Sequence, residues 1–451
     1  MKKKKYIITL SLCFTLLAPT ACDFLDIPLP KDQLVQDNVY TTDQSAIAAV
    51  AGVYEGMINA SGQLGNLNIA LELCADNLAF SGNDNGYVQF FEGNVQENNS
   101  YVQNLWTAFY RNIYRCNAVL EGLPAATNVS PELRDQLRGE LLALRAFCYF
   151  YLINLWEDVP LITGTDYRVN QGLGRTPTTD IQEVMLRDLE EAKGLLTSDY
   201  PSSDRGRINL RAVQALLARI YASLENWQEA ASLAGDIMSD ATYELEGSED
   251  VYKVGSRETI WQLIPYNFPA QAPTHIPGNP GIVPTYYLTP DLIDTFMPDD
   301  KRLQAWTGMN TVGEASYYYS RKYRVTTGNN PVTEALVVFR LAELYLIRAE
   351  ANAILGNEEE ALLDLQAVRS RAGLGDIEVQ GEALLRAITD ERRRELFAEW
   401  GFRWLDLRRT GTADDVLGAA KPGWLPTDAL WPLPINEMER NPYLVPQNPG
   451  Y

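Results

Sequence analysis

Two segments of the chain share a pattern of helix, turn and helix, and this pattern constrains the fold more than any other feature. Apolar residues recur at three- and four-residue spacing from 210 to 238 and again from 341 to 371. That spacing places them on one face of an α-helix. Each run is broken once, at Glu225-Asn226 in the first segment and at Gly356-Asn357 in the second. We therefore expect two pairs of antiparallel helices.

A small residue follows each turn, Ala230 in the first pair and Ala361 in the second. A small side chain that faces the preceding helix lets two helices approach closely, which is the packing logic of tetratricopeptide repeats. The two turns lie 131 residues apart and the copies are degenerate, so they do not predict a continuous solenoid. We expect a scaffold with other material inserted between the pairs.

The rest of the chain divides into helical and irregular stretches. Helices are expected at 45–58, 106–117, 133–156, 178–196 and 381–400. A polar stretch from 81 to 100 indicates a loop, and a Pro-rich tail follows the last helix. Between 258 and 338, Pro, Gly and aromatic residues replace helical periodicity, which indicates loops and short strands. The prediction is a mainly α fold, in which tetratricopeptide-like helix pairs form a scaffold (about 41–240 and 339–410) for a loop-rich ligand-binding part (about 258–338).

The first residues have the composition of a targeting segment. Four Lys follow Met1, an apolar run extends to Leu17, and small residues lead to Cys22. The run is too short for a membrane span but has the length of a signal peptide. We predict that residues 1–21 are a lipoprotein signal peptide, that Cys22 carries the lipid, and that 22–451 is a single domain. Ordinary secretion with cleavage near Ala21 is the alternative.

Composition narrows the range of functions. The chain has 59 acidic and 38 basic residues, a net charge of −21, so it repels phosphate backbones and no nucleic-acid partner is expected. Its single histidine, His275, rules out a multi-His metal site and gives little support to a catalytic triad. We predict no metal and no cofactor. Cys116 and Cys148 lie in apolar helical patterns and are expected to be buried free thiols.

Ordered strings of residues run through the whole chain. The C-terminal third contains FRLAELYLIRAEA (339–351), VRSRAGL (368–374), ERRREL (391–396), RWLDLRR (403–409), WPLPI (431–435) and QNPGY (447–451). The N-terminal part contains CDFLD (22–26), the helix from Gly139-Glu140 to Arg145-Ala146-Phe147, and DVPL (158–161). In order and spacing these strings resemble the SusD/RagB family, and the resemblance covers nearly all of residues 22–451.

The resemblance implies a function. Members of the family are mostly helical, with four tetratricopeptide-like helix pairs, and an N-terminal lipid anchors them in the outer membrane, where they face outward. They act as a lid on a SusC-like TonB-dependent β-barrel transporter, capture a glycan or in some members a peptide, and are not enzymes. The implied partners of this chain are therefore the transporter, the nutrient and the outer membrane.

A sugar binder needs flat aromatic faces beside short amide and carboxylate side chains. The stretch from 81 to 91 and the aromatic residues between 286 and 319 supply both kinds. Three consecutive tyrosines in a strand alternate faces, so Tyr318 is expected to oppose Tyr317 and Tyr319. Trp106 and Tyr110 repeat at helical spacing and are expected in the core. The candidate ligand-binding residues are Asn83, Asp84, Tyr87, Phe90, Tyr286, Trp306, Tyr317 and Tyr319.

The charged residues of the C-terminal strings have a structural interpretation. We expect Glu343, Arg348, Glu350, Glu391, Arg393 and Glu395 to form interhelix ion pairs. Three Arg between Glu391 and Glu395 are expected to keep both ionised, which is the opposite of what a general acid requires.

Two other functions remain as alternatives. One is a tetratricopeptide adaptor that binds only protein, although it leaves the aromatic insertion unexplained. The other is a surface glycoside hydrolase, which needs only two carboxylates, with Asp76, Asp84 or Asp300 as candidates.

Overall fold

The computed structural model describes residues 40–59, 63–265, 269–270, 272–328 and 331–451. Its central element is helix α7 (Pro131–Trp156), which lies within two residues of the helix predicted at 133–156. Pro131 occupies the first helical position, where the missing N–H costs nothing. The second half of α7 is buried on every side, and Phe147, Tyr151 and Trp156 are fully enclosed. Cys148 on α7 and Cys116 on its neighbour are buried free thiols, as predicted.

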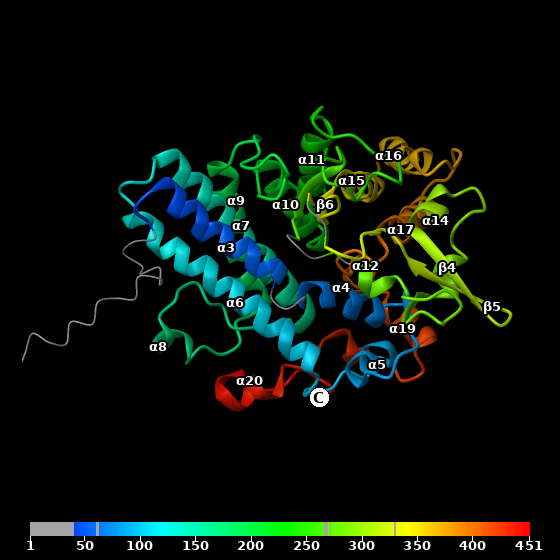
Figure 1. Cartoon of the computed structure of the whole chain (residues 1–451), viewed down its shortest axis with the longest axis horizontal. Helices are drawn as coiled ribbons and strands as arrows, with labels where there is room; N and C mark the ends of the chain where they lie inside the picture. The colour runs from blue at the N-terminus through cyan, green and yellow to red at the C-terminus, as the bar shows by residue number, and fades with distance from the viewer. Residues whose placement is uncertain (1–39, 60–62, 266–268, 271, 329–330) are drawn as a thin grey trace, which may run out of the picture.

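Long helices pack around α7. Helices α6 (Ser100–Gly122) and α9 (Thr178–Leu195) lie against it, and α3 (Asp43–Asn59) covers α6. Figure 1 shows α3, α6 and α7 running side by side through one half of the molecule. Trp106 is in the core, as predicted, and Tyr110 is partly buried against it.

The two predicted helix pairs are α10 (Leu210–Ser223) with α11 (Trp227–Met238), and α15 (Leu341–Leu355) with α16 (Glu358–Arg371). Ala230 and Ala361 are fully buried at the contacts within the pairs. Although the pairs are far apart in sequence, α11 packs directly against α15, so they stack in space. The prediction of a mainly α fold built on helix pairs is confirmed.

The region between the pairs contains short strands, as expected, and also short helices that the sequence did not predict. In the described residues the strands form three antiparallel pairs. These are β1 (Leu78–Phe80) with β3 (Tyr286–Leu288), β2 (Thr259–Leu263) with β6 (Leu336–Arg340), and β4 (Thr307–Val312) with β5 (Ala315–Ser320). The helices are α12 (Ala272–His275), α13 (Pro290–Ile293) and α14 (Lys301–Trp306).

Two predictions of irregular structure were wrong. The stretch from 81 to 100 contains α5 (Asn85–Glu92), because Asp84 caps its N-terminus and Gly93 ends it in the left-handed conformation. The predicted last helix is α17 (Glu382–Leu396), but the chain then forms α18 (Phe402–Arg409), α19 (Ala413–Ala420) and α20 (Ile435–Arg440) before its end. Gly401 starts α18 at φ 69°, a backbone angle that glycine adopts without strain.

Cys22 and the predicted signal peptide lie outside the described residues. Helix α4 (Gln63–Cys74) and the short α8 (Tyr167–Asn170) complete the α-helices of the described residues. Among the helices of the described ranges, none combines the length and the apolar character that a bilayer span requires.

Candidate functional site

Four aromatic side chains from four different elements meet at one end of the β1–β3 pair. Phe80 ends β1, Tyr286 begins β3, Tyr87 lies on α5 and Tyr101 lies on α6. The ring centroids of Tyr87 and Tyr101 are 4.1 Å apart, and that of Tyr286 lies 5.3 Å from Phe80 and 5.4 Å from Tyr87. We call these four residues the tyrosine cluster.

The backbone holds the tyrosine cluster in place. Phe80 is the register partner of Tyr286, which brings residues about 200 positions apart side by side. Asp84 accepts hydrogen bonds from the backbone N–H groups of Gly86 and Tyr87, and its second oxygen accepts one from the Tyr101 hydroxyl at 3.1 Å. One carboxylate thus caps α5 and fixes a ring of the cluster.

The cluster presents both aromatic and polar surface. Tyr101 and Tyr286 are half-buried, and Asn83 and Asp84 are exposed beside them. Burial raises the pKa of Tyr286 to about 12, so its hydroxyl stays protonated and can both donate and accept. Tyr87 is buried, and its hydroxyl donates to Asn66 Oδ1 at 3.2 Å. Its ring packs against the half-buried rings of Tyr101 and Tyr286. This combination suits the apolar faces and hydroxyl edges of a sugar ring.

A second aromatic pair lies on the neighbouring strands. The rings of Tyr287 and Tyr317 meet edge to face at 5.2 Å. Tyr317 and Tyr319 are the register partners of Asn310 and Gly308, so they share one side of the β4–β5 hairpin, as the alternation predicts. Tyr317 and Tyr319 are both half-buried.

Two of the candidate residues lie in the core instead. Phe90 is fully buried on α5, a helix that the sequence did not predict, and its ring centroid lies 5.1 Å from that of Trp431. Trp306 is 1% exposed, its Nε1–H donates to the carbonyl of Ser248, and the Lys322 ammonium lies over its ring. In this conformation neither ring can contact a ligand from solvent. We therefore remove Phe90 and Trp306 from the candidate ligand-binding residues.

Sequence reasoning missed two members of the tyrosine cluster. Phe80 precedes the polar stretch, and Tyr101 follows Asn99, which caps α6. The closeness of Phe80 to Tyr87 along the chain was a usable signal. Tyr101 lies on the same helix as the core residues Trp106 and Phe109, and its spacing along the chain did not distinguish it from them.

The charged residues of the C-terminal strings form a buried network, as predicted. Glu395 on α17 lies in salt bridges with Arg302, Arg340 and Arg371, and all these side chains are at most 6% exposed. Burial by itself would raise the pKa of Glu395, but the three guanidinium groups hold it well below its usual range. The partners come mainly from other elements, so the network ties the insertion to the helical scaffold.

The carboxylates suggested for hydrolysis are also structural. Asp76 accepts hydrogen bonds from Arg403 at 2.7 and 3.0 Å, and these with Arg393 keep its pKa low despite burial. Asp300 is buried, caps α14 and pairs with Arg302 at 2.7 Å. Within the described ranges no group of three or more His, Cys, Asp or Glu is arranged to hold a metal ion.

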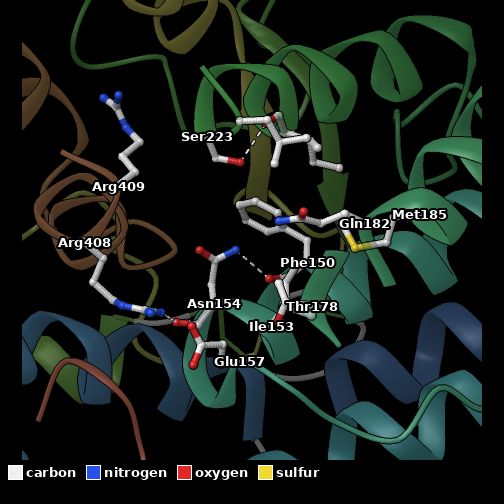
Figure 2. A pocket seen from close by; sticks show the side chains of 12 residues that line it. Phe150, Ile153, Asn154, Glu157, Thr178, Gln182, Met185, Ser223, Arg408 and Arg409 are labelled. Carbon is white, nitrogen blue, oxygen red and sulfur yellow. Dashed lines mark hydrogen bonds between the residues drawn. The ribbon is translucent and has the colours of Figure 1, made fainter. Parts of the chain in front are cut away.

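A separate cavity lies between α7, α9, α10 and α18 (Figure 2). Its volume is about 180 Å³, below the 300–1,000 Å³ typical of ligand sites. Three of its polar side chains are engaged with nearby backbone carbonyls: Arg408 donates to Asn154, the Asn154 side chain to Phe150, and Ser223 to Ile220. The tyrosine cluster is therefore the better candidate for an extended ligand.

Comparison with known proteins agrees with this architecture. The model of the SusD family matches residues 301–451, and a family described as starch-binding and associating with the outer membrane matches residues 23–222. A SusD-like protein of Formosa agariphila is 26% identical over 94% of this chain and 95% of its own length.

Two solved structures share the fold. A SusD superfamily protein from Bacteroides vulgatus superposes with a TM-score of 0.79 at 21% identity, over 91% of this chain and all of its own. Surface glycan-binding protein A from Bacteroides thetaiotaomicron, in complex with laminarihexaose, has a TM-score of 0.77 at 23% identity, over 90% of this chain and all of its own. The two matching family models and the SusD-like relative identify the chain as a member of the SusD/RagB family, and the two solved structures share its fold.

Proposed function

We propose that this chain is a cell-surface lipoprotein that binds oligosaccharides at the tyrosine cluster and delivers them to a SusC-like TonB-dependent transporter. The observation that carries the proposal is the set of half-buried tyrosine rings beside the exposed Asn83 and Asp84. Such rings offer stacking faces, and the flanking amide and carboxylate offer hydrogen bonds to hydroxyl groups. Tyr317 and Tyr319 extend the same kind of surface.

The family supports the same function. A related structure holds laminarihexaose, and another carries the description of a laminarin-binding SusD-like protein. The description of one matching family model includes association with the outer membrane. A lipid on Cys22 would anchor the chain there, facing outward, with the transporter beneath it.

Binding without catalysis is the favoured reading. Glycoside hydrolysis needs a carboxylic acid with a raised pKa beside a second carboxylate. Asp76 and Asp300 are held by guanidinium groups, and Asp84 is the cap of α5. The adaptor alternative predicts no saccharide affinity, and no observed contact favours it.

The test is a binding screen of the purified chain against plant, host and microbial oligosaccharides and a peptide set. We expect a saccharide hit that Tyr286→Ala weakens about five- to thirteenfold, because one half-buried stacking ring contributes about 1–1.5 kcal/mol. Tyr167→Ala is the matched control, since Tyr167 is 72% exposed and lies outside the cluster. Sustained cleavage of a ligand would favour the hydrolase, and hits among peptides alone would remove the glycan assignment.

A further inference from the structure

A cavity of about 730 Å³ lies beyond the other end of the β1–β3 pair from the tyrosine cluster. Its walls come from the α4–β1 turn, the end of α5, the β3–α13 junction and the segment after α19. The lining residues are Ala75, Asp76, Leu78, Ala79, Phe91, Glu92, Asn94, Thr289, Pro290, Asp291, Ala420, Lys421, Pro422 and Gly423. Its volume is within the range of protein ligand sites.

The walls of this cavity are held firmly. Lys421 is 5% exposed, and its ammonium group donates to the carbonyls of Leu73 at 2.7 Å and Phe91 at 2.6 Å. Those carbonyls end α4 and α5, where helix dipoles favour a cation. Thr289 Oγ1 donates to the carbonyl of Asp76 at 2.7 Å, which fixes the opposite wall. The shape is therefore preorganised.

The four charged side chains in the walls differ in the partners that they have. The Asp76 carboxylate forms salt bridges with Arg393 and Arg403. The Lys421 ammonium donates hydrogen bonds to the carbonyls at the ends of α4 and α5. Glu92 and Asp291 are exposed, and within the described part of the chain neither forms a salt bridge. Burial lowers the pKa of Arg393, and the charge of the nearby Asp291 acts against that lowering. These two carboxylates are left to face a ligand.

We propose that this cavity is a second saccharide subsite, which accepts neutral sugars and rejects uronic and sulfated ones. The inference rests on the proposed function and names its substrate class. Carboxylates accept hydrogen bonds from sugar hydroxyl groups, whereas an acidic sugar meets like charge. Helix α5 borders both sites, and the separation of five residues between Tyr87 and Glu92 corresponds to about 8 Å along its axis. An oligosaccharide of a few residues can therefore occupy both.

The first experiment measures discrimination by calorimetry on the purified full chain. The probes are neutral hexasaccharides, laminarihexaose among them, and a hexagalacturonate of equal length. We expect the double variant Glu92→Gln/Asp291→Asn to lower the ratio of neutral to acidic affinity at least tenfold. The matched control is Glu359→Gln/Glu360→Gln, which removes the same charge from the exposed start of α16 and should leave the ratio unchanged.

The second experiment blocks the space. Ala420 is exposed and lines the cavity, so Ala420→Trp fills it without disturbing the core. We expect hexasaccharide affinity to fall at least tenfold, while a disaccharide that needs only the tyrosine cluster binds as before. Unchanged discrimination in the double variant together with unchanged hexasaccharide affinity in Ala420→Trp would overturn the subsite, as would a wild-type preference for the acidic probe. A wild-type chain that binds no saccharide refutes the proposed function itself.

Discussion

Replacing Glu72 by Gln should remove a distinct pH dependence of stability. Glu72 lies on α4, is fully buried, and its Oε2 accepts a hydrogen bond from Asn77 Nδ2 at 2.9 Å. Burial raises the pKa of Glu72 from 4.5 to about 7, against the lowering effect of the bonds from Asn77 and the Ala398 backbone and of the Lys322 charge. The nearby Asp76 adds to the rise.

The effect of Glu72 on the free energy of unfolding follows from the difference between its folded and unfolded pKa. Because the folded state holds the Glu72 proton more tightly than the unfolded state, this group's contribution to stability is complete below pH 4.5 and is lost as the pH rises through 7. A tenfold change in proton affinity corresponds to 1.36 kcal/mol, so the whole effect is about 3 kcal/mol. Gln is neutral at every pH and resembles the protonated acid.

The assay is urea unfolding, followed by tryptophan fluorescence, of wild type and Glu72→Gln between pH 5 and pH 8. We expect the variant to be more stable by about 1 kcal/mol at pH 5, where the carboxyl of the unfolded chain is already mostly ionised, and by about 3 kcal/mol at pH 8. Comparing the two proteins at each pH cancels the titration of other groups, and Glu359→Gln on the surface serves as the control. A difference that stays constant from pH 5 to pH 8 would refute the reasoning.

Three further predictions concern single residues. Arg340→Met should destabilise the chain by about 3–5 kcal/mol, because it leaves Glu258, Glu395 and Glu399 without the cation that they share. Denaturant midpoints measure this loss, and the same change at an exposed surface arginine, as the control, should cost less than about 1 kcal/mol. Gly401→Ala should cost about 2–5 kcal/mol, since a Cβ at φ 69° would lie 2.3 Å from a methyl of Leu71, and an unchanged melting temperature would contradict it. Finally, Cys22→Ala should move the protein from the membrane fraction to the soluble fraction without unfolding it, and retention in the membrane would argue against the lipid.

Local patterns predicted the helices well. The periodicity around α7 placed its ends within two residues, and the two small alanines correctly marked helix pairs. The same patterns missed α5, whose signal is only a cap at Asp84 and a stop at Gly93 within eight mostly polar and aromatic residues. They also missed the helices after Trp400, where the backbone turns through positive φ angles at Ala398, Trp400 and Gly401 that no spacing announces.

For the candidate site, the sequence indicated which kinds of side chain to consider, but it did not indicate which of their rings lie at the surface. The sequence placed candidate aromatic residues beside polar loops near Tyr87 and Tyr286, and as ligand contacts these residues remain a prediction. Trp306 has the same composition of neighbours in the sequence, yet its ring lies beneath a buried ammonium. Burial depends on which distant segments pack against a residue, and composition does not contain that information.

The sequence alone therefore determined the helical scaffold, the family and the kinds of side chain that a sugar site would use, because periodicity, ordered motifs and residue chemistry are local properties. Only the tertiary structure decided which aromatic rings face solvent, since the pairing of β1 with β3 joins residues about 200 positions apart. It also decided that the charged strings serve the core, because the cations that hold Glu395 come from α14, β6 and α16. Long-range packing sets both outcomes, and no single stretch of the chain encodes it.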